Sequence, residues 1–231
     1  MATTKVYYPL ILVNLKTYSE AMGDKAMKLA AAAEKVHDQT GVCVAIAPQT
    51  SYLASVAGAT NAPVFAQHVD AVGFGKYTGH ILPEAMVEAG CAGTLISHSE
   101  RRLEIRGIEE TVKRAREAGL HQVVCVDTIE RGRAVAPFNP DAIAIEPPEL
   151  IGTGIPVSKS RPEVVSGSVE AVHGLNPDIK VLCGAGITSG EDVAAAMRLG
   201  AAGVLVASGV VKATDPLKKL VELASAISTV T

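Results

Sequence analysis

The chain has 231 residues, of which 48% are hydrophobic, and a formal net charge of −3 at pH 7. This length accommodates one or two domains with a large apolar core, and single α/β barrels are commonly of this size. The balanced charge comes without a basic patch interleaved with aromatic residues, so nucleic-acid binding has no support.

The first half of the chain alternates apolar runs with helical patterns. Continuous apolar runs predict strands at residues 9–13, 42–46, 64–67 and 93–96. Apolar residues at helical spacing predict helices over residues 22–36, 51–57, 82–87 and 108–115. A glycine-rich irregular run, residues 73–79, separates the third strand from its helix.

The second half repeats the same alternation. Strands are predicted at residues 123–126, 143–145, 180–183 and 203–206, with a short helix between the first two and helices at 164–172, 193–197 and 217–227. Continuous apolar runs are typical of parallel strands that are buried on both faces. An open doubly wound sheet also shows this alternation. Eight units without a linker or a break in composition favour a single (β/α)8 barrel domain over residues 1–231.

Membrane insertion, secretion and disulfide formation receive no support from the sequence. Residues 1–15 lack the basic flank, apolar region and cleavage site of a secretion signal. The longest nearly apolar run, Leu199–Val211, is too short to span a bilayer. The four cysteines show no paired spacing, and three lie in strand-like runs. We therefore expect reduced, mostly buried cysteines and a cytoplasmic protein.

The stretch after the sixth predicted strand has the features of a catalytic loop. Glu146 ends the strand, two prolines follow at once, and Gly152 and Gly154 come shortly after. Prolines stiffen the exit from the strand, and glycines let the backbone approach a ligand closely. A strand-end acid beside a tight turn would explain this stretch equally well. Interpreted as a functional site, the stretch predicts a carboxylate that acts as a general base and is covered by a moving lid.

In a barrel of this kind the functional residues gather where the strands end. The polar residues that arrive at those ends are Asn14, Lys16, His98, Glu100 and Glu146. The seventh and eighth strands end in small residues, 184–186 and 207–209, before helical stretches; exposed backbone N–H groups there would form a phosphate cradle. Taken alone, the histidine is better explained as a satisfied strand-end residue and the lysine as a solvated one. Together on one rim they predict an active site.

Five pieces of the sequence, in the same order and spanning nearly the whole chain, resemble the triosephosphate isomerase family in its short archaeal form. They are Asn14-Leu-Lys16, Thr78-Gly-His-Ile81, Ile96-Ser-His-Ser-Glu-Arg-Arg102, Glu146-Pro147 with Ile151-Gly-Thr-Gly154, and Gly184-Ala-Gly186. The resemblance implies interconversion of dihydroxyacetone phosphate and glyceraldehyde 3-phosphate, with no cofactor and no metal. It also implies a homo-oligomer, a tetramer in preference to a dimer, in which the loop around residues 77–79 enters a neighbouring subunit.

The resemblance assigns a role to each polar residue on the rim. Glu146 matches the general base, and His98 matches the electrophile that polarises the substrate carbonyl. Lys16 matches the cation that faces the enediolate and the phosphate, and Asn14 positions it while also contacting substrate. Glu100 matches an ionic neighbour of the lysine.

The resemblance also assigns the phosphate contacts, largely to backbone. The matching positions are Ile151, Gly152, Gly186, Ala207 and Ser208. Cys125 matches a cysteine behind the catalytic groups, although a small buried strand residue explains it better. The segment 148–150 departs from the aromatic hinge of many relatives, so lid kinetics do not carry over.

Two other functions fit parts of the sequence. A different phosphate-binding barrel enzyme, such as a prenyl or indole synthase-like protein, would share the glycine-rich turns but would not need Asn14, Lys16, His98 and Glu146 together. A non-catalytic phosphate-binding module would keep Gly184–Gly186 but could lose Glu146. A dinucleotide site at residues 184–190 is rejected, because the glycine spacing is one residue too long and the expected acid is missing.

Overall fold

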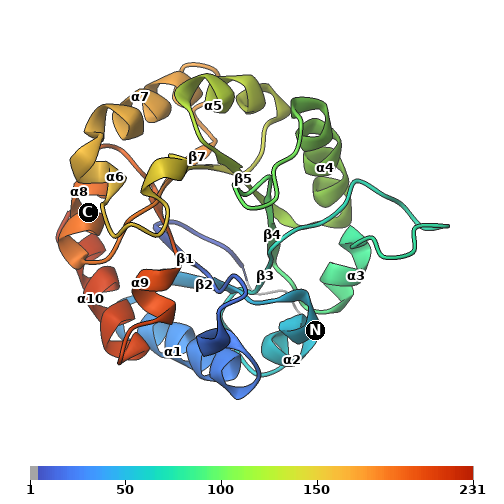
Figure 1. The fold of residues 1–231 in the computed structure, drawn as a ribbon, viewed down its shortest axis with the longest axis horizontal. Coiled ribbons are helices and arrows are strands. Elements are labelled where there is room, and N and C mark those ends of the chain that lie inside the picture. The colour runs from blue at the N-terminus through green and yellow to red at the C-terminus, as the bar shows by residue number, and fades with distance from the viewer. Residues whose placement is uncertain (1–4, 231) are drawn as a thin grey trace.

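The computed structural model describes residues 5–230 and shows a ring of parallel strands enclosed by helices (Figure 1). The strands are β1 (Leu10–Asn14), β2 (Cys43–Ala47), β3 (Phe65–Ala66), β4 (Gly93–Ile96), β5 (His121–Val126), β6 (Ala142–Ile145), β7 (Lys180–Gly184) and β8 (Gly203–Val206). They pair in the order β2-β1-β8-β7-β6-β5-β4-β3. A parallel bridge between Ile46 and Val64 joins the two ends of this order, so the barrel is nearly closed. The predicted (β/α)8 fold is confirmed.

Each strand is followed by helical structure on the outside of the ring. The α-helices are α1 (Asp24–Thr40), α2 (Leu53–Ala57), α3 (Pro83–Glu88), α4 (Ile105–Ala118), α5 (Ile129–Val135), α6 (Val157–Ser160), α7 (Pro162–His173), α8 (Gly190–Arg198), α9 (Ser208–Val211) and α10 (Pro216–Ser228). Short 3-10 helices occur at η1 (Ser19–Ala21), η2 (Thr50–Tyr52), η3 (Ala136–Phe138) and η4 (Pro148–Leu150). Among α6 and the 3-10 helices, only η2 overlaps a predicted helix, at residues 51–57. The others were not predicted, because three or four residues are too few to show a helical period of apolar residues.

Strand β1 shows why the strands read as continuous apolar runs. Successive side chains of a strand point to opposite faces. Leu10 and Leu12 belong to the apolar cluster inside the barrel, whereas Ile11 and Val13 belong to the cluster between strands and helices. The same alternation brings Asn14, which is also buried, to the inner face at the end of the strand. The first predicted polar residue therefore lies directly above the packed barrel interior.

Strand β3 is shorter than the predicted strand at residues 64–67. Only Phe65–Ala66 are paired as a strand. The side-chain amide of Gln67 instead donates hydrogen bonds to the carbonyl oxygens of Lys16, at 3.0 Å, and Ala47, at 2.9 Å. Gln67 thus connects the ends of three neighbouring strands on the rim where the polar residues gather.

Two further predictions concern the whole described chain. All four cysteines are free and buried, and three of them lie in β2, β5 and β7, as the sequence predicts. Within residues 5–230, no helix has both the length and the apolar character that crossing a membrane requires.

Candidate active site

The turn after β1 places a lysine in the site. Lys16 has a φ of 46°, a left-handed conformation that few non-glycine residues adopt. Its backbone N–H donates to Oδ1 of Asn14 at 3.0 Å, and its carbonyl oxygen accepts from Gln67. These two bonds hold the unusual backbone in place. The Lys16 side chain is only 9% exposed, and its Nζ lies 2.9 Å from Oε1 of Glu100.

The turn after β4 fixes the histidine and its tautomer. Ser97 has a φ of 58°, and its Oγ accepts a hydrogen bond from the N–H of Leu103 at 3.1 Å. The backbone N–H of Glu100 lies 3.2 Å from Nδ1 of the buried His98. An amide N–H can only donate, so Nδ1 is the acceptor and the neutral ring carries its proton on Nε2.

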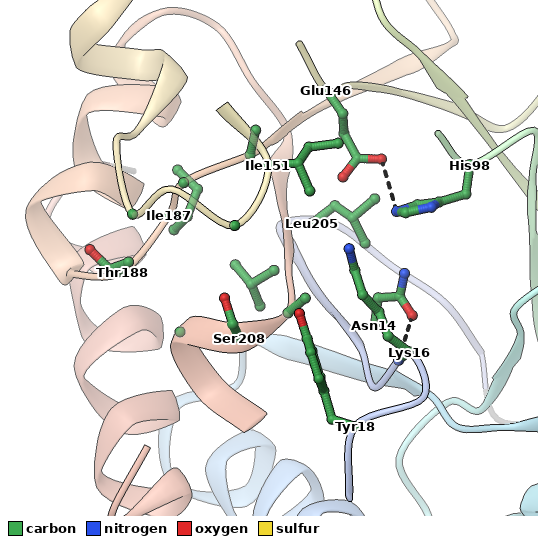
Figure 2. A pocket seen from close by; sticks show the side chains of 17 residues that line it. Asn14, Lys16, Tyr18, His98, Glu146, Ile151, Ile187, Thr188, Leu205 and Ser208 are labelled. Carbon is green, nitrogen blue, oxygen red and sulfur yellow. Dashed lines mark hydrogen bonds and ion pairs between the residues drawn. The ribbon is translucent and has the colours of Figure 1, made fainter. Parts of the chain in front are cut away.

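Glu146 follows β6 and faces the histidine across the site (Figure 2). Its Oε2 lies 3.5 Å from Nε2 of His98. Both atoms are buried, and neither has a hydrogen-bond partner among the described residues. Buried polar atoms are almost always paired, so these two are candidates to bind a ligand. A Cβ on Gly184 would lie 2.5 Å from Cγ of Glu146, and the glycine at the end of β7 therefore makes room for the acid.

Cys125, on β5, lies behind the acid. It lines a small cavity together with Glu146 and Ser97. Burial raises the pKa of the Cys125 thiol well above its usual range, and the nearby Glu146 carboxylate raises it further. The cysteine therefore remains a neutral thiol that packs against the acid.

The other half of the cavity is formed by the predicted phosphate contacts. Its lining includes Ile151 and Gly152 from the segment after β6, Gly186 after β7, and Ala207 and Ser208 after β8. Gly152 and Gly186 have φ values of 75° and 71°, as glycine permits. Within residues 5–230 their backbone N–H groups have no hydrogen-bond acceptor. The cavity thus has free backbone donors opposite the acid and the histidine.

Nine of the eleven residues singled out in the sequence line this cavity. Of the other two, Glu100 pairs with Lys16, and Cys125 lies behind Glu146. The structure also adds residues that the sequence did not indicate, among them Tyr18, Ile187, Thr188 and Leu205 (Figure 2). Tyr18 lies in the connection between β1 and η1, where no periodic pattern exists. The ammonium of Lys212 lies 4.4 Å from the centre of its ring, an attractive cation–π contact. That these residues line the cavity can be recognised only from the structure, because segments distant along the chain bring them together.

A family model described as triosephosphate isomerase matches residues 9–226 of the chain.

The chain belongs to the triosephosphate isomerase family.

Curated relatives named triosephosphate isomerase extend the match. The protein of Methanobacterium bryantii is 51% identical over 219 residues, covering 95% of this chain and 97% of the relative. The protein of Methanocaldococcus jannaschii is 51% identical over 214 residues, covering 93% and 98%. The protein of Methanosarcina barkeri is 52% identical over 215 residues, covering 93% and 97%. The resemblance to the archaeal form is thereby confirmed, and the chain is an isomerase rather than a synthase-like barrel or a non-catalytic phosphate-binding module.

Proposed function

We propose that this chain interconverts dihydroxyacetone phosphate and glyceraldehyde 3-phosphate by general acid–base catalysis. The route uses protein side chains alone, without a cofactor or metal, within a single domain of residues 1–231. The observation that carries the proposal is the pair of buried, unpartnered atoms, Oε2 of Glu146 and Nε2 of His98, which face the same cavity 3.5 Å apart. One accepts a proton and the other donates a hydrogen bond, which are the two functions that enolisation requires.

Each side chain then has a defined step. Glu146 removes a proton from the carbon next to the substrate carbonyl, and the C–H electrons form the new C=C bond of an enediolate. The carbonyl oxygen gains negative charge, which the N–H of His98 stabilises through a hydrogen bond. Glu146 returns the proton to the neighbouring carbon, and proton exchange between the two oxygens through His98 completes the isomerisation.

Lys16 provides positive charge throughout this cycle. Its backbone is held by Asn14 and its ammonium by Glu100, so the charge is already placed before substrate arrives. A fixed cation in a largely water-excluded site stabilises developing negative charge without reorganisation. Because the substrate phosphate is also anionic, Lys16 supports both binding and the chemical step.

The phosphate itself is assigned to the backbone donors opposite the acid. Free N–H groups at Gly152 and Gly186 and the N-terminal turn at Ser208 offer hydrogen bonds, and Ile151 and Ala207 shape the pocket between them. Asn14 completes the binding residues from the floor of the cavity.

An isomerisation assay in D2O tests this proposal. The wild-type chain should convert dihydroxyacetone phosphate to glyceraldehyde 3-phosphate in a coupled assay. Because a carboxylic acid exchanges its proton with solvent while the enediolate exists, a substantial share of product should carry deuterium on the carbon that receives the proton. Absence of isomerisation would overturn the proposal. Isomerisation with complete retention of the original hydrogen, together with normal turnover of Glu146→Gln, would exclude Glu146 as the base.

We further propose that the chain acts as a homo-oligomer, a tetramer in preference to a dimer, in the cytoplasm. The connection between β3 and α3 extends away from the barrel (Figure 1) and carries Phe74, which is 80% exposed, and the half-exposed Tyr77. Asp70 closes its base: its N–H donates to the carbonyl of Ile81, and its carboxylate accepts the N–H of Ile81. An ordered apolar tip of this kind is suited to a pocket on a second copy.

Light scattering on the eluted protein tests the oligomer. The wild-type chain should elute at four times the monomer mass, and Phe74→Ser should shift the population toward smaller species while keeping the circular dichroism of a barrel. A monomeric wild-type protein would overturn this part of the proposal.

The proposed cytoplasmic location is supported by the four free, buried cysteines, which fit a reducing compartment.

A further inference from the structure

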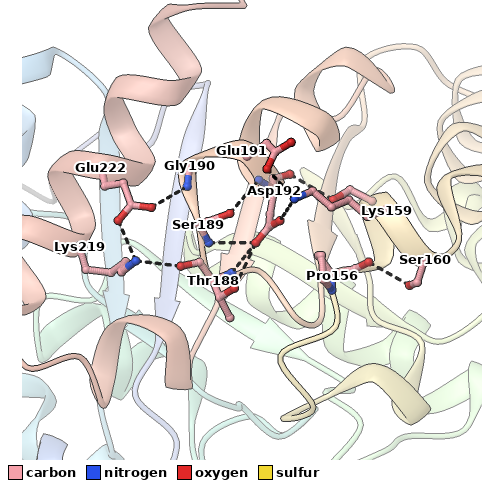
Figure 3. Close-up of polar contacts among 11 residues, drawn as sticks. Pro156, Lys159, Ser160, Thr188, Ser189, Gly190, Glu191, Asp192, Lys219 and Glu222 are labelled. Atoms are coloured by element: carbon pink, nitrogen blue, oxygen red, sulfur yellow. Dashed lines mark hydrogen bonds and ion pairs between the residues drawn. The ribbon is translucent and has the colours of Figure 1, made fainter.

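The loop between β7 and α8, residues 185–189, is held by a buried carboxylate (Figure 3). The side chain of Asp192, in the first turn of α8, is only 4% exposed. Its Oδ2 accepts hydrogen bonds from the N–H groups of Thr188, at 3.1 Å, and Ser189, at 2.9 Å, and from Oγ1 of Thr188 at 3.2 Å. One oxygen therefore fixes the backbone only two residues beyond Gly186.

The other oxygen of Asp192 reaches a different element. Oδ1 lies 2.9 Å from Nζ of Lys159, and the backbone carbonyl of Asp192 accepts from Oγ of Ser158 at 3.1 Å. Both partners lie on α6, which follows the predicted lid, residues 147–154; we call residues 155–160 the C-terminal stem of the lid. Arg161, directly after α6, lies with Nη1 2.6 Å from Oε1 of Glu149 in the segment after β6, and this pair joins the two ends of the segment. The C-terminal stem of the lid is thus attached to the loop that contains Gly186.

The backbones of the two segments also fit closely. A Cβ at Gly186 would lie 1.8 Å from the carbonyl oxygen of Ile155, and the N–H of Val157 points to the carbonyl of Ala185 at 3.4 Å. This leaves no space for the stem to shift against the loop without breaking the contacts of Asp192. Position and charge at residue 192 therefore affect both segments at once.

The charges favour a specific pair over a general surface attraction. Burial by itself raises the pKa of Asp192, but the hydrogen bonds from Lys159, Thr188 and Ser189 outweigh it and hold the pKa below its usual value. Lys159 has a second partner, Glu191, at 2.9 Å, whose side chain is 76% exposed. Exposed pairs contribute little because water screens them, whereas a buried charge that loses its partner is costly.

We propose that Asp192 is a positioning residue for the isomerase reaction. It fixes the phosphate-binding loop with one carboxylate oxygen and fastens the stem of the lid to that loop with the other, through Lys159. The inference rests on the proposed function, because it takes Gly186 and Gly152 as phosphate contacts. Its consequence is that the pair Asp192–Lys159 governs how well the closed lid protects the enediolate from losing its phosphate as methylglyoxal.

A second clamp on the same loop provides a matched comparison (Figure 3). Glu222, on α10, accepts the N–H of Gly190 at 2.9 Å, and Lys219 donates to the carbonyl of Thr188 at 2.9 Å. This clamp holds the loop from α10, and among the described residues Lys219 and Glu222 make no hydrogen bond or ion pair with α6. Lys219→Met should therefore loosen the loop alone, whereas Lys159→Met should loosen the stem alone.

The experiment compares the variants Lys159→Met, Asp192→Asn, Lys219→Met and Glu191→Gln with wild type. Measurements are kcat, KM, the Kd of inorganic phosphate, the ratio of methylglyoxal to isomerised product, and hydrogen exchange of α6. For Lys159→Met and Asp192→Asn, the methylglyoxal ratio and the exchange rate of α6 should each rise about tenfold, the change that loss of one charge-assisted hydrogen bond produces. Lys219→Met should raise KM and the phosphate Kd, while the ratio of methylglyoxal to isomerised product stays at the wild-type value. Glu191→Gln should match wild type throughout.

The double variant Lys159→Met with Asp192→Asn should have the methylglyoxal ratio of Asp192→Asn alone, because Asp192→Asn already weakens the bond to Lys159 as well as the contacts of Oδ2 with the loop. Lys159→Arg keeps the positive charge, so it should keep the wild-type ratio of methylglyoxal to isomerised product. An unchanged ratio and unchanged exchange in Lys159→Met, or additive effects in the double variant, would overturn the inference. Lys159→Met alone decides if Asp192→Asn fails to fold, and the exchange of α6 remains a test even if the wild type has no isomerase activity.

Discussion

The two ends of the barrel differ in how most of their buried polar groups are paired, although Oε1 of Gln122 at the N-terminal end is also buried without a partner among the described residues. At the N-terminal end, the hydroxyl of Tyr8 lies 2.8 Å from Nε2 of His121, and Asp141 accepts the N–H of Gln122 at 2.8 Å. His121 also packs edge-on against the ring of Phe65. These groups pair with one another and close the bottom of the barrel.

At the C-terminal end the corresponding groups are left open. Glu146 and His98 present atoms that have no partner among the described residues, and Lys16 and Ser97 are held in positive-φ conformations. Unpaired groups and strained backbone reduce stability, and folds retain them where a ligand will use them. The difference indicates that one end serves stability and the other serves chemistry, and each prediction below tests that division.

The largest expected effect is on the base. Glu146→Gln keeps the shape of the side chain and removes its basicity, so kcat should fall by at least about 10²–10⁴-fold. The melting temperature should stay near the wild-type value, because the replaced oxygen has no partner to lose. The coupled assay and calorimetry give both numbers, and Glu163→Gln, an exposed acid on α7, serves as the control. Near-normal turnover would show that another residue removes the proton.

Lys16→Met should affect binding and chemistry together. In the proposed mechanism the ammonium of Lys16 faces both the ground-state phosphate and the charge of the enediolate, so KM should rise and kcat should fall. The Kd of inorganic phosphate, measured by calorimetry, should rise in parallel. Lys113→Met, an exposed change on α4, is the matched control. An unchanged phosphate affinity would remove Lys16 from the binding residues.

Substituting one glycine at each end of the barrel tests the two ends separately. Gly186→Ala places a Cβ 1.8 Å from the carbonyl oxygen of Ile155 and should raise KM and the methylglyoxal ratio in addition to lowering stability. Gly203→Ala places a Cβ 2.1 Å from the carbonyl of Leu10, inside the barrel wall, and should lower stability by about 1–3 kcal/mol, as overpacking does. Urea unfolding and steady-state kinetics distinguish the two outcomes. If Gly186→Ala leaves KM and the methylglyoxal ratio of the folded enzyme unchanged, or if Gly203→Ala raises them, the division fails.

Tyr8→Phe should weaken only the closed end. The change removes the partner of Nε2 of His121, and we expect a loss of about 1 kcal/mol in the free energy of unfolding, since the contact is only partly buried. The ratio kcat/KM should equal that of wild type. A kinetic defect in this variant would mean that the bottom of the barrel communicates with the rim.

The smallest effect is a pH dependence of stability. Burial lowers the pKa of His121, and the nearby Asp141 offsets this only in part; burial likewise lowers the pKa of His68, against the opposing effect of Asp70. The unfolded chain therefore binds more protons once the pH falls below about 6.5, the ordinary histidine pKa, and stability declines from there downward. Melting temperatures between pH 8 and pH 5 should show this decline, with a shallower slope in His121→Gln. An equal slope in both proteins would mean that His121 does not titrate on unfolding.

The sequence predicted the barrel, which the structure confirms, and it singled out residues that the structure gathers around one cavity. Parallel strands that are covered on both faces read as continuous apolar runs, and their ends meet on one rim. For that reason Asn14, His98 and Glu146 could be placed together without knowing any distance between them. The backbone donors at Gly152 and Gly186 followed from the glycines that such turns require.

The tertiary structure alone decided the contacts between segments that are distant along the chain. Tyr18 enters the cavity from a connection without a period, and the neutral tautomer of His98 depends on one N–H, that of Glu100. The bond between Lys159 and Asp192 joins α6 to α8, and neither residue has a local pattern that marks it. Periodicity records which face of an element is buried, whereas side-chain partners depend on how the elements pack, and packing is a property of the whole barrel.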